Sequence, residues 1–179
     1  MVTFIITKKT IVRIYLDKSS QRRYNTTKTF EEIYKMLKKR LYLTAAIAVT
    51  IFIFSNSLMP ATESDEISRG LLSIILEIIP FDISHTFLRK LAHFTEFFSQ
   101  GFFLALFFNE SFKENKKTAV CTASTGFLTA CIDETIQLFI EGRGPALRDV
   151  LIDFSGTLSS LIFLLVIACV LQSRSSLKC

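Results

Sequence analysis

The 179-residue sequence contains no tryptophan, only two histidines, three prolines and six glycines. So few prolines and glycines exclude collagen-like chains and proline-rich low-complexity chains. Its four cysteines form no CxxC pair, so neither a zinc ribbon nor a disulfide framework is indicated. No GxGxxG, P-loop, GxSxG or HExxH motif occurs either. We therefore expect no cofactor and no resident metal, and no catalytic residue can be assigned.

Apolar residues, by contrast, make up half of the chain, and its mean hydropathy is +0.41. This composition excludes intrinsic disorder. The net charge of +5 is unevenly distributed: residues 1–40 hold 11 Lys and Arg against 3 Asp and Glu, which is +8 there and −3 over the other 139 residues. A basic arm on an apolar body indicates a membrane protein rather than a nucleic-acid-binding protein.

Four stretches are long enough to cross a bilayer, which takes about 17–25 mainly apolar residues. The first and the C-terminal part of the fourth are strongly apolar, whereas the second and third carry ionisable residues. We predict an all-α, polytopic membrane protein built as a four-helix transmembrane bundle. The predicted spans are residues 41–58, 91–108, 119–140 and 150–171.

The distribution of Lys and Arg near the span ends predicts the orientation. The segments on the side of the two termini hold 12 such residues, and the segments on the other side hold 5. We therefore predict a multi-pass protein with both termini in the cytoplasm and the loop 59–90 outside. Within this loop, residues 65–79 have helical period with one apolar face, which predicts an amphipathic helix lying on the outer leaflet.

Three domains are expected along the chain. Residues 1–35 show neither a signal sequence nor a sustained period, so they are predicted to be a poorly ordered basic arm, or an upstream extension of a chain that starts at Met36. Residues 36–172 form the membrane domain and 173–179 a cytoplasmic tail. The first span could also be a cleaved signal peptide. Cleavage would leave only three spans, so the four-span interpretation is preferred.

Polar residues inside the predicted spans, or within a few residues of their ends, mark the candidate site, because charges within a bilayer are costly. They follow single helical faces, and the antiparallel spans bring them all to within about 10 Å of the outer surface at 1.5 Å per residue. The run Ser55–Ser57 reaches the same level. The candidate residues are Lys90, His93, Glu96, Asp133, Glu134, Gln137, Arg143, Asp149 and Asp153.

Local pairing is the simpler interpretation of these groups. His93 and Glu96, three residues apart, could form an intrahelical pair near a helix end. Asp133 lies deeper and is predicted to pair with Arg143 or His93.

Three segments resemble the signature of the VanZ-like family of small bacterial membrane proteins: IFSNSLMPA (53–61), RKLAHFTEFF (89–98) and DETIQLFIEGRGPALRDVLID (133–153). The resemblance implies a cell-envelope protein of the bacterial cell membrane, typical of Gram-positive bacteria. It also implies a link to antibiotic resistance, since the founding member is associated with resistance to teicoplanin, a lipid-tailed glycopeptide. The matching positions are Phe54, Ser55, Lys90, His93, Phe94, Glu96, Asp133, Glu134, Gln137, Phe139, Gly142, Arg143, Asp149, Val150, Asp153 and Gly156.

Functions of different classes fit these residues. The first is a non-enzymatic protein in which Lys90, Arg143 and Arg148 bind the anionic headgroup of an amphiphile at the outer leaflet. Its partners would be membrane lipids and an amphiphilic antibiotic or a lipid-linked wall precursor, with no nucleic acid. A small ion-coupled transporter is another possibility.

An enzyme acting on a lipid-linked envelope substrate is the remaining alternative. In that case His93 would serve as general base, paired to Glu96. Asp133, Glu134 and Asp153 would then hold a divalent cation.

Overall fold

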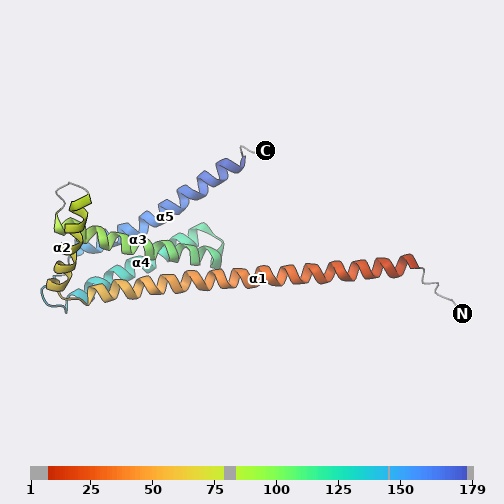
Figure 1. The fold of residues 1–179 in the computed structure, drawn as a ribbon, viewed down its shortest axis with the longest axis horizontal. Coiled ribbons are helices and arrows are strands. Elements are labelled where there is room, and N and C mark those ends of the chain that lie inside the picture. The colour runs from red at the N-terminus through yellow and green to blue at the C-terminus, as the bar shows by residue number, and fades with distance from the viewer. Residues whose placement is uncertain (1–7, 79–83, 145, 177–179) are drawn as a thin grey trace. The chain divides into compact units, whose positions relative to one another are not determined.

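The computed structural model describes residues 8–78, 84–144 and 146–176, and these residues form five α-helices and no strand. The predicted all-α class is therefore confirmed for the described part of the chain. In chain order the helices are α1 (Lys8–Ser57), α2 (Ala61–Ile78), α3 (His85–Phe112), α4 (Asn115–Gln137) and α5 (Leu147–Ser176) (Figure 1).

The chain divides into two compact units, residues 1–38 and 39–179, and α1 continues through the boundary. In the first unit α1 begins at Lys8, within the segment for which the sequence predicted a poorly ordered arm. The predicted start of the membrane domain at residue 36 remains a prediction. The candidate site residues all belong to the second unit.

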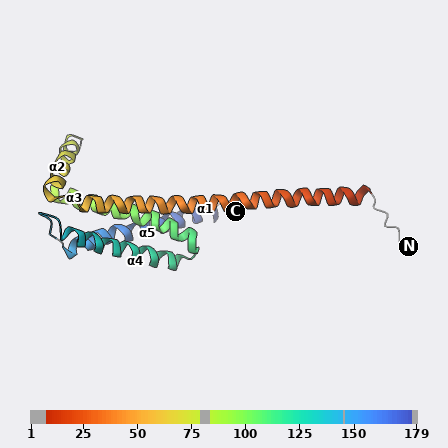
Figure 2. The same ribbon diagram turned by 90° about the horizontal axis from the view of Figure 1, so that it is seen from below.

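In the second unit, α3 packs most extensively against α5 and also contacts α4 and α2, while α4 packs against α5. Figure 2 shows α3, α4 and α5 running beside one another. Residues 39–57 of α1 join them through Ile53, which is fully buried together with Phe97 and Ala130. The core is small, and its buried polar residues outnumber its buried apolar ones.

Two of the described helical segments are long and apolar enough to cross a membrane, Thr86–Phe112 and Leu147–Arg174. A third is added if Lys28–Ser57 and Ala61–Gly70, which are bent by 110° at their break, count as one span. The helix α4 does not meet this test, because many of its residues are polar. Several of these polar residues are buried inside the unit. The structure thus supports two or three candidate spans rather than the four that the sequence predicted.

The helix ends differ from the predicted span ends in one place that matters for the site. The third span was predicted to run to residue 140, but α4 ends at Gln137 and the chain continues in turns. Phe139 is 84% exposed there, and Gly142 has a left-handed φ of 76° that favours glycine. A turn therefore replaces the last residues of the predicted span.

The helix α2 contains most of the predicted amphipathic segment 65–79 but begins earlier, at Ala61 directly after Pro60. Proline suits such a position because it lacks the N–H that a first helical turn leaves unpaired. The apolar face predicted beyond Gly70 lies outside the residues whose side chains the structure describes. Its predicted position on the outer leaflet remains a prediction.

Candidate functional site

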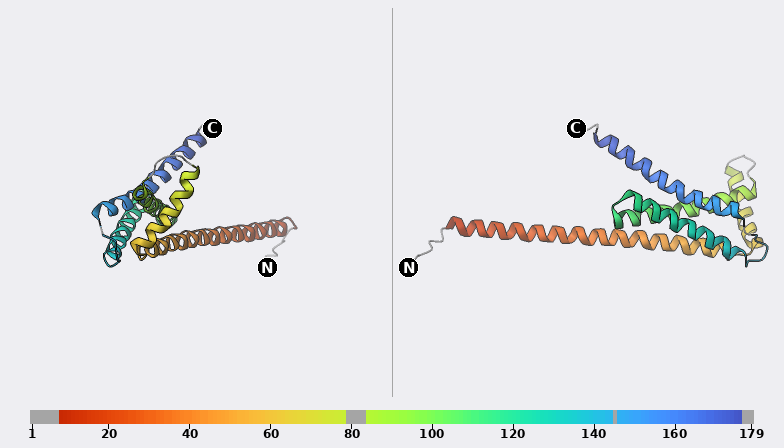
Figure 3. Two further views of the ribbon diagram at one scale, coloured as in Figure 1. Left: turned by 60° about the vertical axis from the view of Figure 1, so that its left-hand side comes forward. Right: turned by 180° about the vertical axis from the view of Figure 1, so that it is seen from behind.

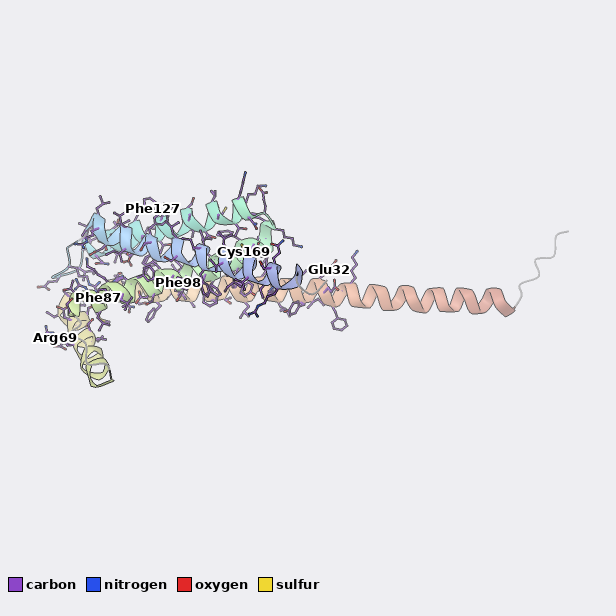
Figure 4. The ribbon with its side chains drawn as sticks, turned by 90° about the horizontal axis from the view of Figure 1, so that it is seen from above. Glu32, Arg69, Phe87, Phe98, Phe127 and Cys169 are labelled. Carbon is purple, nitrogen blue, oxygen red and sulfur yellow. The ribbon has the colours of Figure 1, made fainter. Side chains whose placement is uncertain are left out.

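One end of the second unit gathers the candidate residues. The end of α1, the end of α4 and the starts of α3 and α5 meet at this end, together with α2 (Figure 3). Figure 4 shows Phe87 near the start of α3 and Arg69 on α2 at the same end, while Cys169 on α5 lies far from it. The antiparallel course of the helices thus collects side chains from four separate parts of the sequence.

Asp133 of α4 is completely buried and accepts two hydrogen bonds. The hydroxyl of Ser57 at the end of α1 donates to its Oδ1, and Gln137 Nε2 donates to its Oδ2 over 2.9 Å. The sequence predicted Arg143 or His93 as its partner. Among the described residues neither donates a hydrogen bond to it, although a ring nitrogen of His93 lies within 4.8 Å of its carboxylate. Neutral donors from α1 and from the next turn of α4 hold this carboxyl group instead.

Arg143 lies in the loop after α4 and is partly buried. Its Nη2 donates to the carbonyl oxygen of Asn56 over 3.0 Å, and Asn56 Nδ2 in turn donates to Glu96 Oε1 over 2.8 Å. Among the described residues, no carboxylate oxygen lies within 4.0 Å of this guanidinium. Burial and the positive charge of Arg89 lower the pKa of Arg143, and the opposing effect of the carboxylates of Asp133, Glu134 and Asp65 is smaller.

The other ionic contacts at this end fix the loop between α4 and α5 and the start of α3. Glu134 accepts a hydrogen bond from the backbone N–H of Ala146 over 3.0 Å. Lys90 and Asp149 form a salt bridge of 2.8 Å between α3 and α5. Because both members of that pair are about 30% exposed, solvent screens their attraction.

His93, Asp133 and Asp153 come from α3, α4 and α5, and each can offer a ligand atom within 4.8 Å of the other two. His93 Nδ1 lies 3.9 Å from Asp153 Oδ1. The alternative of an intrahelical pair between His93 and Glu96 is not what the structure shows, because Glu96 Oε1 accepts from Asn56 and the described residues show no hydrogen bond between the two side chains. We call these three residues the His93–Asp133–Asp153 cluster.

Two cavities open at this end of the unit. The smaller, of about 70 Å³, is lined by charged and polar side chains from α3, α4, α5 and the loop 138–146. The larger, of about 280 Å³, lies between α1, α2 and α3 and includes the apolar side chains of Phe52 and Ile67. Arg89, His93 and Arg143 line both cavities, so they stand where the polar space adjoins the more apolar one.

The sequence model of the VanZ/LLP1 family matches residues 41–169. The chain belongs to this family. No curated protein and no solved structure matches it. The matched range contains every candidate residue and leaves residues 1–40 outside it, so the resemblance stated from the three sequence segments is confirmed.

Eight of the nine candidate residues of this VanZ/LLP1 family member line the walls of these two cavities. Glu96 lines only the larger cavity. Asp133, the ninth, lies behind the smaller cavity as part of the cluster. Arg148, proposed as an anion contact, is exposed and lines neither cavity.

Sequence reasoning missed an ion pair between Asp65 of α2 and Arg89, at 3.4 Å. It also missed the role of Gln100, whose Nε2 donates to Thr50 Oγ1 over 2.8 Å and to Thr129 Oγ1 over 3.2 Å. Threonines in an apolar helix give no local sign of such a link. The only sign of this link in the sequence is that Gln100 lies seven residues after His93, on the same helical face.

Proposed function

We propose that this VanZ/LLP1 family protein crosses the membrane four times, with α1, α3, α4 and α5, and keeps both termini in the cytoplasm. The asymmetry of Lys and Arg supports the orientation. For α4, the polar residues Thr122, Asp133 and Glu134 are buried inside the unit, while Leu128 and Ile132 are exposed. A helix with its polar face turned inward can stand in lipid although its average hydropathy is low.

Labelling of Cys179 tests this topology. A membrane-impermeant thiol reagent should label that cysteine only after the cells are permeabilised. Labelling in intact cells would place the C-terminus outside and overturn the orientation.

We further propose that the outer end of this bundle binds the anionic headgroup of an amphiphile. The observation that carries the proposal is Arg143, a partly buried guanidinium with no carboxylate oxygen of the described residues within 4.0 Å, so none forms a direct ion pair with it. Buried charges in proteins are normally paired, and guanidinium groups bind phosphate or carboxylate groups through two parallel hydrogen bonds. Arg143 donates to one backbone carbonyl and retains further N–H groups for an anion.

The larger cavity supports an amphiphile rather than a free anion. It adjoins Arg143 and has an apolar side formed in part by Phe52, Met59 and Leu88. A headgroup held at Arg143 would therefore place its tail against these side chains and the surrounding lipid. A lipid-tailed glycopeptide such as teicoplanin and a lipid-linked wall precursor both have this chemistry.

Susceptibility testing of a sensitive Gram-positive host that expresses the protein tests the proposal. Wild type should raise the inhibitory concentration of a lipid-tailed glycopeptide more than that of a glycopeptide without a tail. Arg143→Ala and Glu134→Ala should abolish this protection at equal membrane abundance, the first by removing the anion contact and the second by releasing the loop that holds Arg143. Arg148→Ala is the matched control, since it removes an exposed arginine from the start of α5.

Equal protection by wild type and by Arg143→Ala would overturn the antibiotic form of the proposal. Loss of protection in Arg148→Ala as well would show that general surface charge is responsible, which would overturn the specific role of Arg143.

Catalysis on a lipid-linked envelope substrate is a second candidate function, favoured by His93 in a cavity wall with Asp153 close to its Nδ1. Such a histidine could accept a proton from a reacting hydroxyl or water. Membranes from cells with wild-type protein would then contain a modified lipid that His93→Gln cells lack. Identical lipid mass spectra from the two strains would exclude this candidate.

A further inference from the structure

Three side chains with metal-binding atoms converge behind the smaller cavity, each from a different helix. These are the members of the His93–Asp133–Asp153 cluster, whose ligand atoms lie within 4.8 Å of one another. We infer that this cluster is a binding site for one divalent transition-metal ion. The inference is independent of the headgroup proposal, because it rests on atoms that the headgroup does not need to touch.

Two buried atoms of the cluster have no hydrogen-bond partner among the described residues, His93 Nδ1 and Asp153 Oδ2. Asp153 is 1% exposed, so water does not reach most of its carboxyl group. Buried polar atoms in folded proteins are nearly always hydrogen-bonded, and the exceptions need an explanation. A metal ion bound between the imidazole nitrogen and the carboxylate would satisfy both atoms at once.

The charges and distances of the cluster suit a divalent ion. Two carboxylates this close repel each other when both are ionised, and a dication removes that repulsion. Around a tetrahedral ion with bonds of about 2.1 Å, neighbouring ligand atoms lie about 3.4 Å apart. The 3.9 Å between His93 Nδ1 and Asp153 Oδ1 is close to this separation.

The neighbouring residues support this choice of ligands. The hydrogen bonds from Ser57 and Gln137 orient the carboxyl group of Asp133, as outer-shell donors do at metal sites. The three other acidic candidates have partners elsewhere. Glu134 accepts from the N–H of Ala146, Glu96 Oε1 accepts from Asn56, and Asp149 pairs with Lys90. The sequence had placed Glu134 among the ligands of a divalent cation and had left out His93.

The donor set also indicates the kind of ion. One imidazole and two carboxylates are typical ligands for Zn²⁺, Mn²⁺ or Fe²⁺, whereas Mg²⁺ and Ca²⁺ prefer oxygen ligands alone. Three protein ligands leave further positions for water or an anion. Asp153 and His93 also line the smaller cavity of about 70 Å³. Water or an anion in this cavity would therefore reach the open coordination positions of the ion.

Titration of the full-length protein with Mn²⁺ tests the inference. The protein is purified in detergent, stripped with a chelator and titrated with MnCl₂ while free Mn²⁺ is followed by electron paramagnetic resonance. We expect about one bound ion per chain, because one cluster offers one set of ligands. Pulsed measurements on the bound Mn²⁺ should show modulation from a single imidazole ¹⁴N, and Zn²⁺ should displace the Mn²⁺.

Two ligand variants and a control locate the ion. Asp153→Asn and His93→Gln each remove a direct ligand of the ion. Loss of an outer-shell partner weakens metal binding by ~10–100-fold, so each of these variants should weaken Mn²⁺ binding by more than that. Glu141→Gln removes an exposed carboxylate from the loop after α4, outside the cluster and both cavities, and should leave Mn²⁺ binding unchanged because the ligands and their hydrogen-bond partners remain.

Absence of Mn²⁺ and Zn²⁺ binding by the wild-type protein at millimolar metal would overturn the inference. Bound Mn²⁺ that shows no modulation from an imidazole nitrogen would also overturn the inference. This measurement uses the wild-type protein, so it does not depend on the folding of any variant. Equal weakening by Glu141→Gln and Asp153→Asn would indicate diffuse attraction by acidic groups and would also contradict the site.

Discussion

Replacement of Gly156 by alanine tests how closely α5 approaches α3. A Cβ atom at this position would collide with the carbonyl oxygen of Phe94, and would lie 3.0 Å from the backbone nitrogen of Phe98 and 3.2 Å from the Cβ of Phe97. Two of these neighbours are backbone atoms of α3 and cannot move aside as the end of a flexible side chain can. The two helices must therefore separate to admit one methyl group.

Two effects of opposite sign decide the outcome. Alanine raises the helix propensity by about 0.5–1 kcal/mol over glycine, which alone would stabilise the protein. Overpacking of a close contact costs about 1–3 kcal/mol, and here it falls on the most extensive helix contact of the unit. We expect a net loss of about 1–2 kcal/mol in the free energy of unfolding.

Thermal melts in detergent, followed by circular dichroism, measure this loss. At about 2–4 °C per kcal/mol for a chain of this size, Gly156→Ala should lower the Tm by about 2–8 °C. Gly70→Ala in α2 is the control, because among the described residues no atom lies within 4 Å of a Cβ there. An equal or higher Tm for Gly156→Ala would refute the close approach.

Two further predictions concern buried and exposed polar contacts. Asp133→Leu leaves the donors of Ser57 and Gln137 without their acceptor, at about 1–3 kcal/mol for each buried group, whereas Asp133→Asn keeps an acceptor oxygen and should cost less. Melts of both variants equal to wild type would contradict this network. A double-mutant cycle on Lys90 and Asp149 should give a coupling of only about 0.2–1 kcal/mol, because solvent reaches both side chains, and a value above about 2 kcal/mol would show that the pair is desolvated.

Much of the helical arrangement could be predicted from the sequence, because helical periodicity shows which side chains share a face. The spacing of His93 and Glu96 placed both on one face of the predicted helix in this way, and both line the larger cavity. The number of spans is harder to predict from the sequence, because mean hydropathy averages over all faces of a helix. In α4 the buried polar face lowers that average although exposed apolar residues remain.

The individual partners could not be predicted, because each residue along a helix turns the side chain by about 100° and moves it by 1.5 Å. A small change in the rotation of α1 decides whether Ser57 or another group reaches Asp133. The pair of Asp65 with Arg89 depends in addition on the 110° bend between α1 and α2. The residues Leu138–Ile140 are apolar, so the sequence pattern extends the predicted span through them. The backbone hydrogen bonds show instead that α4 ends at Gln137 and that turns follow.

Native mass spectrometry of the purified full-length protein tests the proposed headgroup site most directly. After mild detergent removal, wild-type protein should retain a bound amphiphile as an added mass, and Arg143→Gln should lose most of it while Arg148→Gln keeps it. Fragmentation of the complex should release an anionic molecule with a phosphate or carboxylate headgroup. Equal retention by the Arg143→Gln variant and the wild type, or no bound amphiphile on either, would contradict the proposal that Arg143 holds a headgroup.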